Sequence, residues 1–242
     1  AERFGARVER AEVGESNGVG KAAALRREGT RVRLLGEGSN GGTIIHPSSV
    51  RDPMSTIGAV VKLIRMEASA GGRSPLDVWS EVSGVELPSK PSVAEILATL
   101  PRFTTTGAYE SRAILRMPVP DHGALKRAYE EVFPAAFEEE AETLKTRFGL
   151  VSWREVNYEG GEERAGVGNR ARPGPERGGL KILFSDASGV DRGFIWMRGS
   201  KTEPVFRILA DIEGDDVEGE AWLLEWQRGL ITRAAGSIKT VP

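Results

Sequence analysis

Two strand-like runs flank one short polar turn in the last quarter of this 242-residue chain. The first run is Phe194–Met197, and in the second run Phe206, Ile208, Ala210 and Ile212 occupy alternate positions. Such alternation is typical of a strand with one buried face. Two strands joined by so short a turn must run antiparallel, so this part of the chain is expected to form an antiparallel sheet.

The turn itself carries the side chains that a phosphate group prefers. Arg198 and Arg207 bracket it, and Ser200, Lys201 and Thr202 lie between them. An arginine fork can bind two phosphate oxygens at once, and hydroxyl and amide groups add neutral donors. The alternative is a plain hairpin in which Arg198 pairs with Glu203. Two arginines, two hydroxyls and a lysine within ten residues favour phosphate binding.

The net charge of the chain is small and negative, so any anion binding must depend on local groups. The chain has 33 basic and 35 acidic residues, a net charge of −2, so no general field attracts nucleic acid or an anionic membrane. It has no cysteine, which excludes disulfides and thiol catalysis and agrees with a cytoplasmic location. No stretch has the length and apolarity of a membrane span. We therefore expect neither a nucleic-acid partner nor a membrane partner.

A second glycine-rich stretch, Gly36–Gly42, matches the pattern G-x-G-x-x-G. A β-branched run follows it instead of the helix that a dinucleotide site requires, so a Rossmann oxidoreductase is a distant alternative. Glu37 and Ser39 can instead grip the hydroxyl groups of a sugar. The competing interpretation of this stretch is a turn with a solvated glutamate. A P-loop over Gly14–Lys21 is disfavoured because Ala22 occupies the position of the magnesium-binding hydroxyl.

The rest of the sequence predicts a three-layer α/β domain followed by an α+β domain with an antiparallel sheet. The first of these domains is expected to be incomplete at its start. The domains are expected at residues 1–107 and 108–242, with a mobile glycine-rich loop at 159–179. Expected strands are Ala6–Val13, Ala113–Met117 and Leu180–Phe184. Expected helices begin near Ser55, after Ser92 in a capping box, at Asp121 with an end at Pro134, and near Val217. The aromatic residues of the helices, Trp222 and Trp226 among them, are expected in the core.

The two polar stretches together resemble the alpha-D-phosphohexomutase superfamily, the phosphoglucomutases and phosphomannomutases. Gly36-Glu37-Gly38-Ser39 matches the start of the sugar-binding signature G-E-x-S-G-G, and Asn40 departs from it. Arg198, Ser200, Thr202, Glu203 and Pro204 match the phosphate-binding signature R-x-S-G-T-E-P, with Lys201 in place of its glycine. The order of the two signatures fits the third and fourth domains of that family, and the resemblance covers nearly the whole chain.

The resemblance implies a function and a division of roles. The chain is expected to be the C-terminal fragment of an isomerase that interconverts hexose 1-phosphate and hexose 6-phosphate through a hexose 1,6-bisphosphate. Glu37 and Ser39 would bind the sugar, and Arg198, Ser200, Lys201, Thr202 and Arg207 would bind the phosphate.

The serine loop and the metal loop of the family have no match in this sequence. The phosphoserine and Mg²⁺ are therefore expected in N-terminal domains outside it, with no catalytic residue and no metal ligand in this chain. The fragment alone is expected to be inactive. The alternative from another class is a stand-alone, non-catalytic phosphosugar-binding protein.

Overall fold

The computed structural model describes residues 5–37, 42–66, 72–117, 121–172, 174–200 and 205–238. Within these ranges the chain forms two compact units. The first contains residues 5–9, 22–37 and 42–101, and the second contains residues 10–21 and 102–238. The chain therefore crosses between the units more than once, and a short N-terminal segment, residues 10–21, belongs to the second unit. The two units are described separately below.

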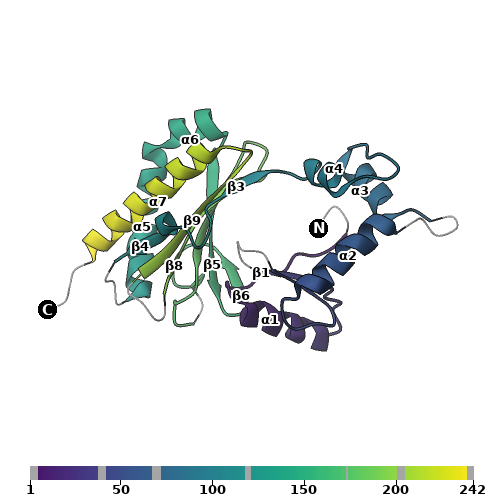
Figure 1. Ribbon diagram of the computed structural model, residues 1–242. Coiled ribbons are helices and arrows are strands. Elements are labelled where there is room, and N and C mark those ends of the chain that lie inside the picture. The colour runs from purple at the N-terminus through teal and green to yellow at the C-terminus, as the bar shows by residue number, and fades with distance from the viewer. Residues whose placement is uncertain are drawn as a thin grey trace. The chain divides into compact units, whose positions relative to one another are not determined.

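The second unit is built on a seven-stranded sheet in which all pairings are antiparallel (Figure 1). Its strand order is β3-β9-β8-β7-β5-β6, and β4 also pairs with β9. Because β3 pairs with residues 211–213 and β4 with residues 205–207, both lie along the same edge of β9. The strands are β3 (Phe103–Thr105), β4 (Ile114–Arg116), β5 (Ser152–Glu159), β6 (Glu162–Ala165), β7 (Leu180–Ser185), β8 (Asp191–Gly199) and β9 (Val205–Glu213).

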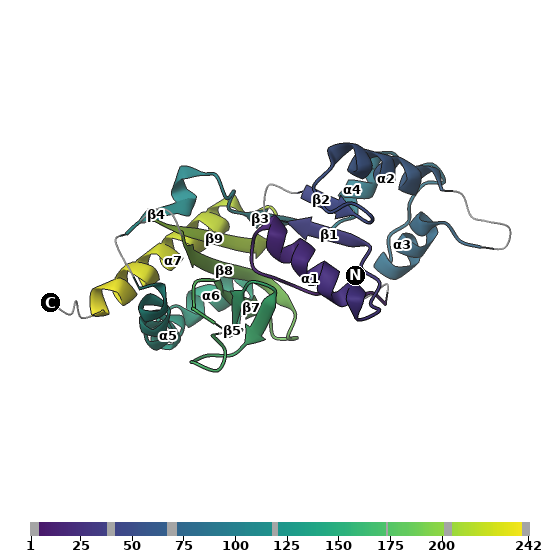
Figure 2. The ribbon, with the colours of Figure 1, turned by 90° about the horizontal axis from the view of Figure 1, so that it is seen from below.

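Three helices, α5 (His122–Glu139), α6 (Ala141–Phe148) and α7 (Val217–Ser237), complete this unit. Figures 1 and 2 show α5 and α7 side by side on one face of the sheet. Phe133 of α5 is 1% exposed and lies within aromatic contact of Trp153, Phe184 and Trp226. Phe133 and Phe137 are thus part of the core, as expected, and Trp222 and Trp226 pack against it while only partly buried.

Most elements begin where the sequence places them. Asp121 caps α5 by accepting a hydrogen bond from the amide of Ala124, and Ser92 forms a capping box with Glu95 at the start of α4 (Val93–Ala98). The expected end of the helix at Pro134 is wrong, because α5 continues to Glu139. A proline inside a helix removes one hydrogen bond. Here the burial of Phe133, Ala136 and Phe137 on the same helix offsets that cost.

The first unit combines helices with a two-stranded antiparallel sheet of β1 (Leu34–Glu37) and β2 (Gly42–Ile45). Its helices are the latter part of α1 (Glu15–Arg27), α2 (Pro53–Arg65), α3 (Pro75–Ser83) and α4. Together the two units confirm the expected fold class, an α/β domain followed by an α+β domain with an antiparallel sheet. Three layers were expected in the first unit. Its described part contains one small two-stranded sheet and the helices named above.

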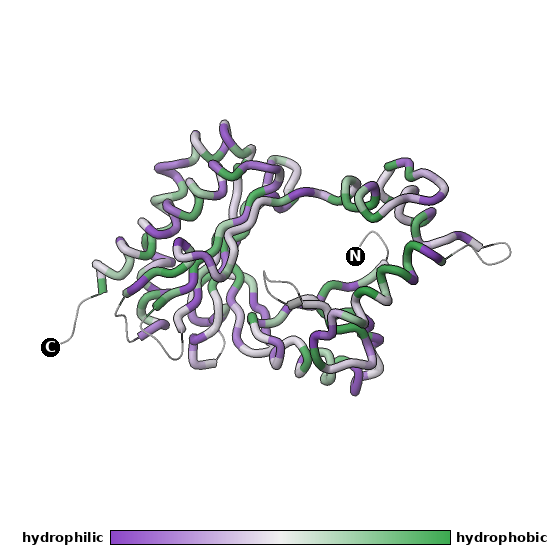
Figure 3. The backbone as a smooth tube through the Cα atoms, in the orientation of Figure 1, coloured by the Kyte–Doolittle hydropathy of each residue, from purple (hydrophilic) through white to green (hydrophobic). Residues whose placement is uncertain are grey.

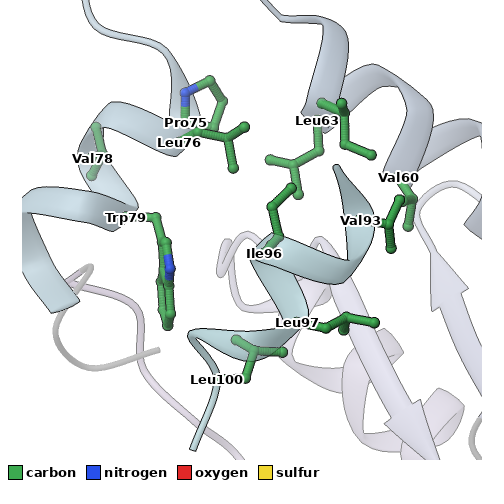
Figure 4. Close-up of a pocket in the computed structure, with 11 residues that line it drawn as sticks. Val60, Leu63, Pro75, Leu76, Val78, Trp79, Val93, Ile96, Leu97 and Leu100 are labelled. Carbon is green, nitrogen blue, oxygen red and sulfur yellow. The ribbon is translucent and has the colours of Figure 1, made fainter. Parts of the chain in front are cut away.

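The helices of the first unit bury little of their apolar surface. Apolar residues follow α2 along its length (Figure 3), yet Met54, Ile57 and Val61 are all more than half exposed. On another side of α2, a pocket of about 590 Å³ opens between α2, α3 and α4 (Figure 4). Trp79 forms one wall of this pocket and donates its indole N–H to Thr99 Oγ1 at 2.8 Å. The core of the protein therefore lies almost entirely in the second unit.

Two further expectations need correction. Residues 6–12 have no regular structure, although a strand was expected over Ala6–Val13. Alternating polarity does not produce a strand without a neighbouring strand to pair with. Toward the described part of the chain, the segment forms one isolated backbone hydrogen bond, from Glu12 N to Gly160 O at 2.9 Å. The glycine-rich stretch 159–179 is not irregular throughout, because it contains β6 paired with β5. Its mobility stays a prediction.

The aromatic core makes a direct prediction about stability. Replacing Phe133 with alanine should lower the free energy of unfolding by about 3–5 kcal/mol, because it leaves a cavity between α5, α7 and the sheet. Urea unfolding followed by near-ultraviolet circular dichroism measures this change. The control Tyr109→Ala, at a side chain that is 77% exposed, should change it by less than about 0.5 kcal/mol. Equal effects of the two variants would contradict this description of the core.

Candidate functional site

The two arginines of the predicted phosphate site face each other across neighbouring strands. In the register of β8 and β9, Arg198 is the direct partner of Arg207. Direct partners in an antiparallel pair point to the same face of a sheet, with Cβ atoms about 5 Å apart. Met197 and Ile208 point to the opposite face, which α5 and α7 cover. Both arginines therefore lie on the sheet face away from these helices, at the end of β8 and near the start of β9.

The guanidinium of Arg198 is held by the protein on one side. Its Nη1 donates to the carbonyl oxygen of Val13 at 3.2 Å and lies 3.6 Å from Glu12 Oε1. Its Nε is buried and has no hydrogen-bond partner within the described chain. A buried N–H group without an acceptor costs about 1–3 kcal/mol. The free donor lies on the guanidinium edge formed by Nε and Nη2, which is one of the edges that bind a phosphate or carboxylate in a fork.

Arg207 has a weaker anchor. Its Nη1 donates to the carbonyl oxygen of Ala108 at 3.2 Å, and no carboxylate in the described part of the chain pairs with it. Like charges directly opposite each other in a sheet repel. Because Glu12 is the acidic group described beside this pair, the two arginines keep an excess of positive charge. This excess favours an anion at the end of β8 and the start of β9.

The other predicted site residues are described only in part. Ser200 follows β8, and its amide donates to the carbonyl oxygen of Val205 at 2.8 Å. Lys201 and Thr202 lie outside the described residues, as does Ser39. Glu37 is the last residue of β1, in the first unit, and its side chain is also outside the description. The phosphate-binding roles of Ser200, Lys201 and Thr202 and the sugar-binding roles of Glu37 and Ser39 stay predictions.

Sequence reasoning missed the contribution of Glu12. This side chain is 6% exposed, and its carboxylate accepts hydrogen bonds from the amides of Val13 and Gly179. A Cβ atom at Gly178 would lie 2.7 Å from Glu12 Oε2 and 1.6 Å from the carbonyl oxygen of Tyr158, so only glycine fits there. The pair Gly178-Gly179 is therefore the sequence signal that another chain segment approaches closely at this point.

His122 was also missed as a neighbour of the end of β8. A Cβ atom at Gly199 would lie 2.2–2.5 Å from the His122 ring, so the end of β8 passes directly over the first turn of α5. Burial lowers the pKa of His122, and the charges of Lys126 and Arg177 lower it further, against the opposing effect of Asp121. The imidazole is therefore largely neutral at neutral pH and packs edge-on against Phe206.

A buried polar cluster anchors the segment that leads to Gly178-Gly179. The Arg172 side chain is 2% exposed, pairs with Glu130 of α5, and contacts Glu176 at 2.9 Å. Beside this pair, Glu155 of β5 is 2% exposed and accepts a hydrogen bond from the side-chain Nδ2 of Asn157 at 2.6 Å. Burial raises the pKa of Glu155 to about 8, and the neighbouring Glu130 carboxylate adds to the rise.

The raised pKa of Glu155 predicts a pH-dependent stability. Between pH about 4.5 and about 8 the folded chain keeps a proton on Glu155 that the unfolded chain releases, so this group's contribution to stability falls as pH rises. In Glu155→Gln this loss is absent, and the variant should gain stability relative to wild type across that window, by on the order of a few kcal/mol. Urea unfolding at several pH values measures the difference. The exposed control Glu225→Gln should follow wild type, and a Glu155→Gln curve parallel to wild type would contradict the assignment.

Comparison with known proteins assigns no family. No model of a protein family matches the chain, and a search among curated proteins finds no match either. Within the described ranges, no group of three or more histidine, aspartate or glutamate side chains is placed to hold a metal ion. None of the described helices is long and apolar enough to cross a membrane.

Proposed function

We propose that the end of β8 and the start of β9 bind the phosphate group of a phosphorylated hexose. The single observation that carries this proposal is the guanidinium of Arg198, which the protein fixes at Nη1 while its buried Nε has no partner in the described chain. A phosphate oxygen at Nε would satisfy that donor and remove its desolvation cost. A second oxygen of the same phosphate could bind Nη2, because the two donors are parallel in the guanidinium plane.

The surroundings of Arg198 support an anion and not a cation or an apolar group. Arg207 adds a second positive charge on the same face, directly opposite in the sheet register. The other end of β8 gives an instructive contrast, because Arg192 binds Asp186 at 2.8 Å and Glu213 at 2.6 Å. Arg192 is therefore neutralised by the protein. Among the described residues, by contrast, Glu12 is the carboxylate that lies near Arg198, and none pairs with Arg207.

A phosphohexomutase is the activity that best accounts for this site together with the sequence resemblance. In such an enzyme this unit would supply positioning, which is a large part of catalysis of phosphoryl transfer. Arg198 and Arg207 would hold the phosphate that is not being transferred, and Glu37 and Ser39 would hold the sugar. The phosphoserine and Mg²⁺ would be contributed by other domains of the same polypeptide. This chain would then be the C-terminal portion of that polypeptide, located in the cytoplasm and inactive alone.

Titration with glucose 1,6-bisphosphate, followed through the backbone amide signals by NMR, tests the proposal. We expect shifts around Arg198, Ser200 and Arg207, with a Kd of about 1 mM, or roughly −4 kcal/mol. Arg198→Ala should weaken binding at least about tenfold, because it removes charge-assisted hydrogen bonds worth about 1.5–3 kcal/mol.

Arg192→Ala is the matched control. It removes an arginine from the same strand, but one that is paired with two carboxylates. Its affinity should stay within about twofold of wild type, since its charge is already compensated. Equal weakening by the two substitutions would indicate a general charge effect and would contradict a site at Arg198.

A further inference from the structure

We propose that Glu12 is a positioning residue that orients Arg198 for phosphate binding. The inference rests on the proposed phosphate site and adds to it a residue that the sequence pattern did not indicate. Glu12 lies 186 positions before Arg198 in the chain, in the short N-terminal segment that belongs to the second unit. It would act through Arg198 and would not touch the phosphate itself.

The first step of the argument is that Glu12 is itself held rigidly. Its carboxylate accepts from the amides of Val13 and Gly179, and its own amide donates to the carbonyl oxygen of Gly160 at 2.9 Å. Lys126 of α5 adds an attractive charge, and the side chain is almost fully buried. A carboxylate fixed at several points can hold a longer and more flexible side chain in one orientation.

The second step concerns which part of Arg198 is engaged. Glu12 Oε1 and the carbonyl oxygen of Val13 both lie at Nη1, and neither reaches the buried Nε. Glu12 therefore does not occupy the guanidinium edge that would bind the anion. An arginine side chain loses about 2 kcal/mol of rotamer entropy when it is fixed. The contacts at Nη1 restrict the side chain before phosphate binds. Part of the rotamer entropy is therefore already lost in the free protein, and the edge formed by Nε and Nη2 is already oriented.

Affinity alone does not test this role, because Glu12 has two opposing effects. Its negative charge repels a phosphate, and its contact with Nη1 orders the arginine that attracts the phosphate. A double-mutant cycle separates the two effects. Direct repulsion between Glu12 and phosphate does not depend on Arg198 and cancels in the cycle, whereas positioning requires Arg198 and remains.

The experiment measures inorganic phosphate affinity by NMR titration for wild type, Glu12→Gln, Arg198→Ala and the double variant. Arg198→Ala should weaken binding at least about tenfold in wild type but less than about threefold in the Glu12→Gln background. The control is Glu159→Gln, because Glu159 accepts from the neighbouring amide of Gly178 at 2.7 Å, and no hydrogen bond or ion pair of the described chain joins it to Arg198. In the Glu159→Gln background, Arg198→Ala should keep its full effect. Additive changes in the Glu12 cycle would overturn the proposal.

A second measurement needs no ligand. In wild type the Arg198 Nε–H should give a distinct signal with slow rotation of the guanidinium, assigned by its loss in Arg198→Lys. Glu12→Gln should speed this rotation, while Glu159→Gln should leave it unchanged. An unaltered Arg198 signal in folded Glu12→Gln would overturn the positioning role. If the signal responds as expected but no protein binds phosphate, the proposed function fails and the contact between Glu12 and Arg198 stands.

Discussion

The antiparallel pairing of β8 with β9 determines where the candidate site can lie. Its register sets Arg198 opposite Arg207 on one face, and it sets Met197 and Ile208 against α5 and α7 on the other. Because side chains alternate along a strand, a shift of one residue would bury the arginines and expose the core. Burial of the apolar face therefore determines which side chains lie on the polar face. The burial that stabilises the unit also fixes the position of its excess positive charge.

Segments distant in the sequence complete the environment of Arg198. Arg172 ties the stretch after β6 to Glu130 of α5, and this stretch leads to the pair Gly178-Gly179 before β7. Gly179 binds the carboxylate of Glu12, and Glu12 with Val13 fixes one nitrogen of Arg198. Each link in this series is a buried charge or a close backbone approach. A substitution far from Arg198 in the sequence, such as one at Arg172, would therefore affect the geometry at Arg198.

The sequence predicted features that depend on local signals better than features that depend on distant segments. The alternation after Phe206 and the caps at Ser92 and Asp121 are local signals, and the structure follows them. The continuation of α5 through Pro134 could not be predicted, because it depends on burial against strands far along the chain. The lack of a strand over residues 6–12 has the same origin, since pairing needs a neighbour that the local sequence does not specify. Glu12 was missed because its role depends on two glycines more than 160 positions away.

The proposed function rests on one claim, that the edge of the Arg198 guanidinium that carries Nε receives a phosphate. A crystal structure of this chain grown with glucose 1-phosphate tests that claim most directly. We expect the phosphate within hydrogen-bond distance of Arg198 Nε, with Nη1 still bound to Val13 and Glu12. A phosphate bound elsewhere, or an Arg198 Nε that donates to a protein acceptor while ligand is present at saturation, would contradict the account.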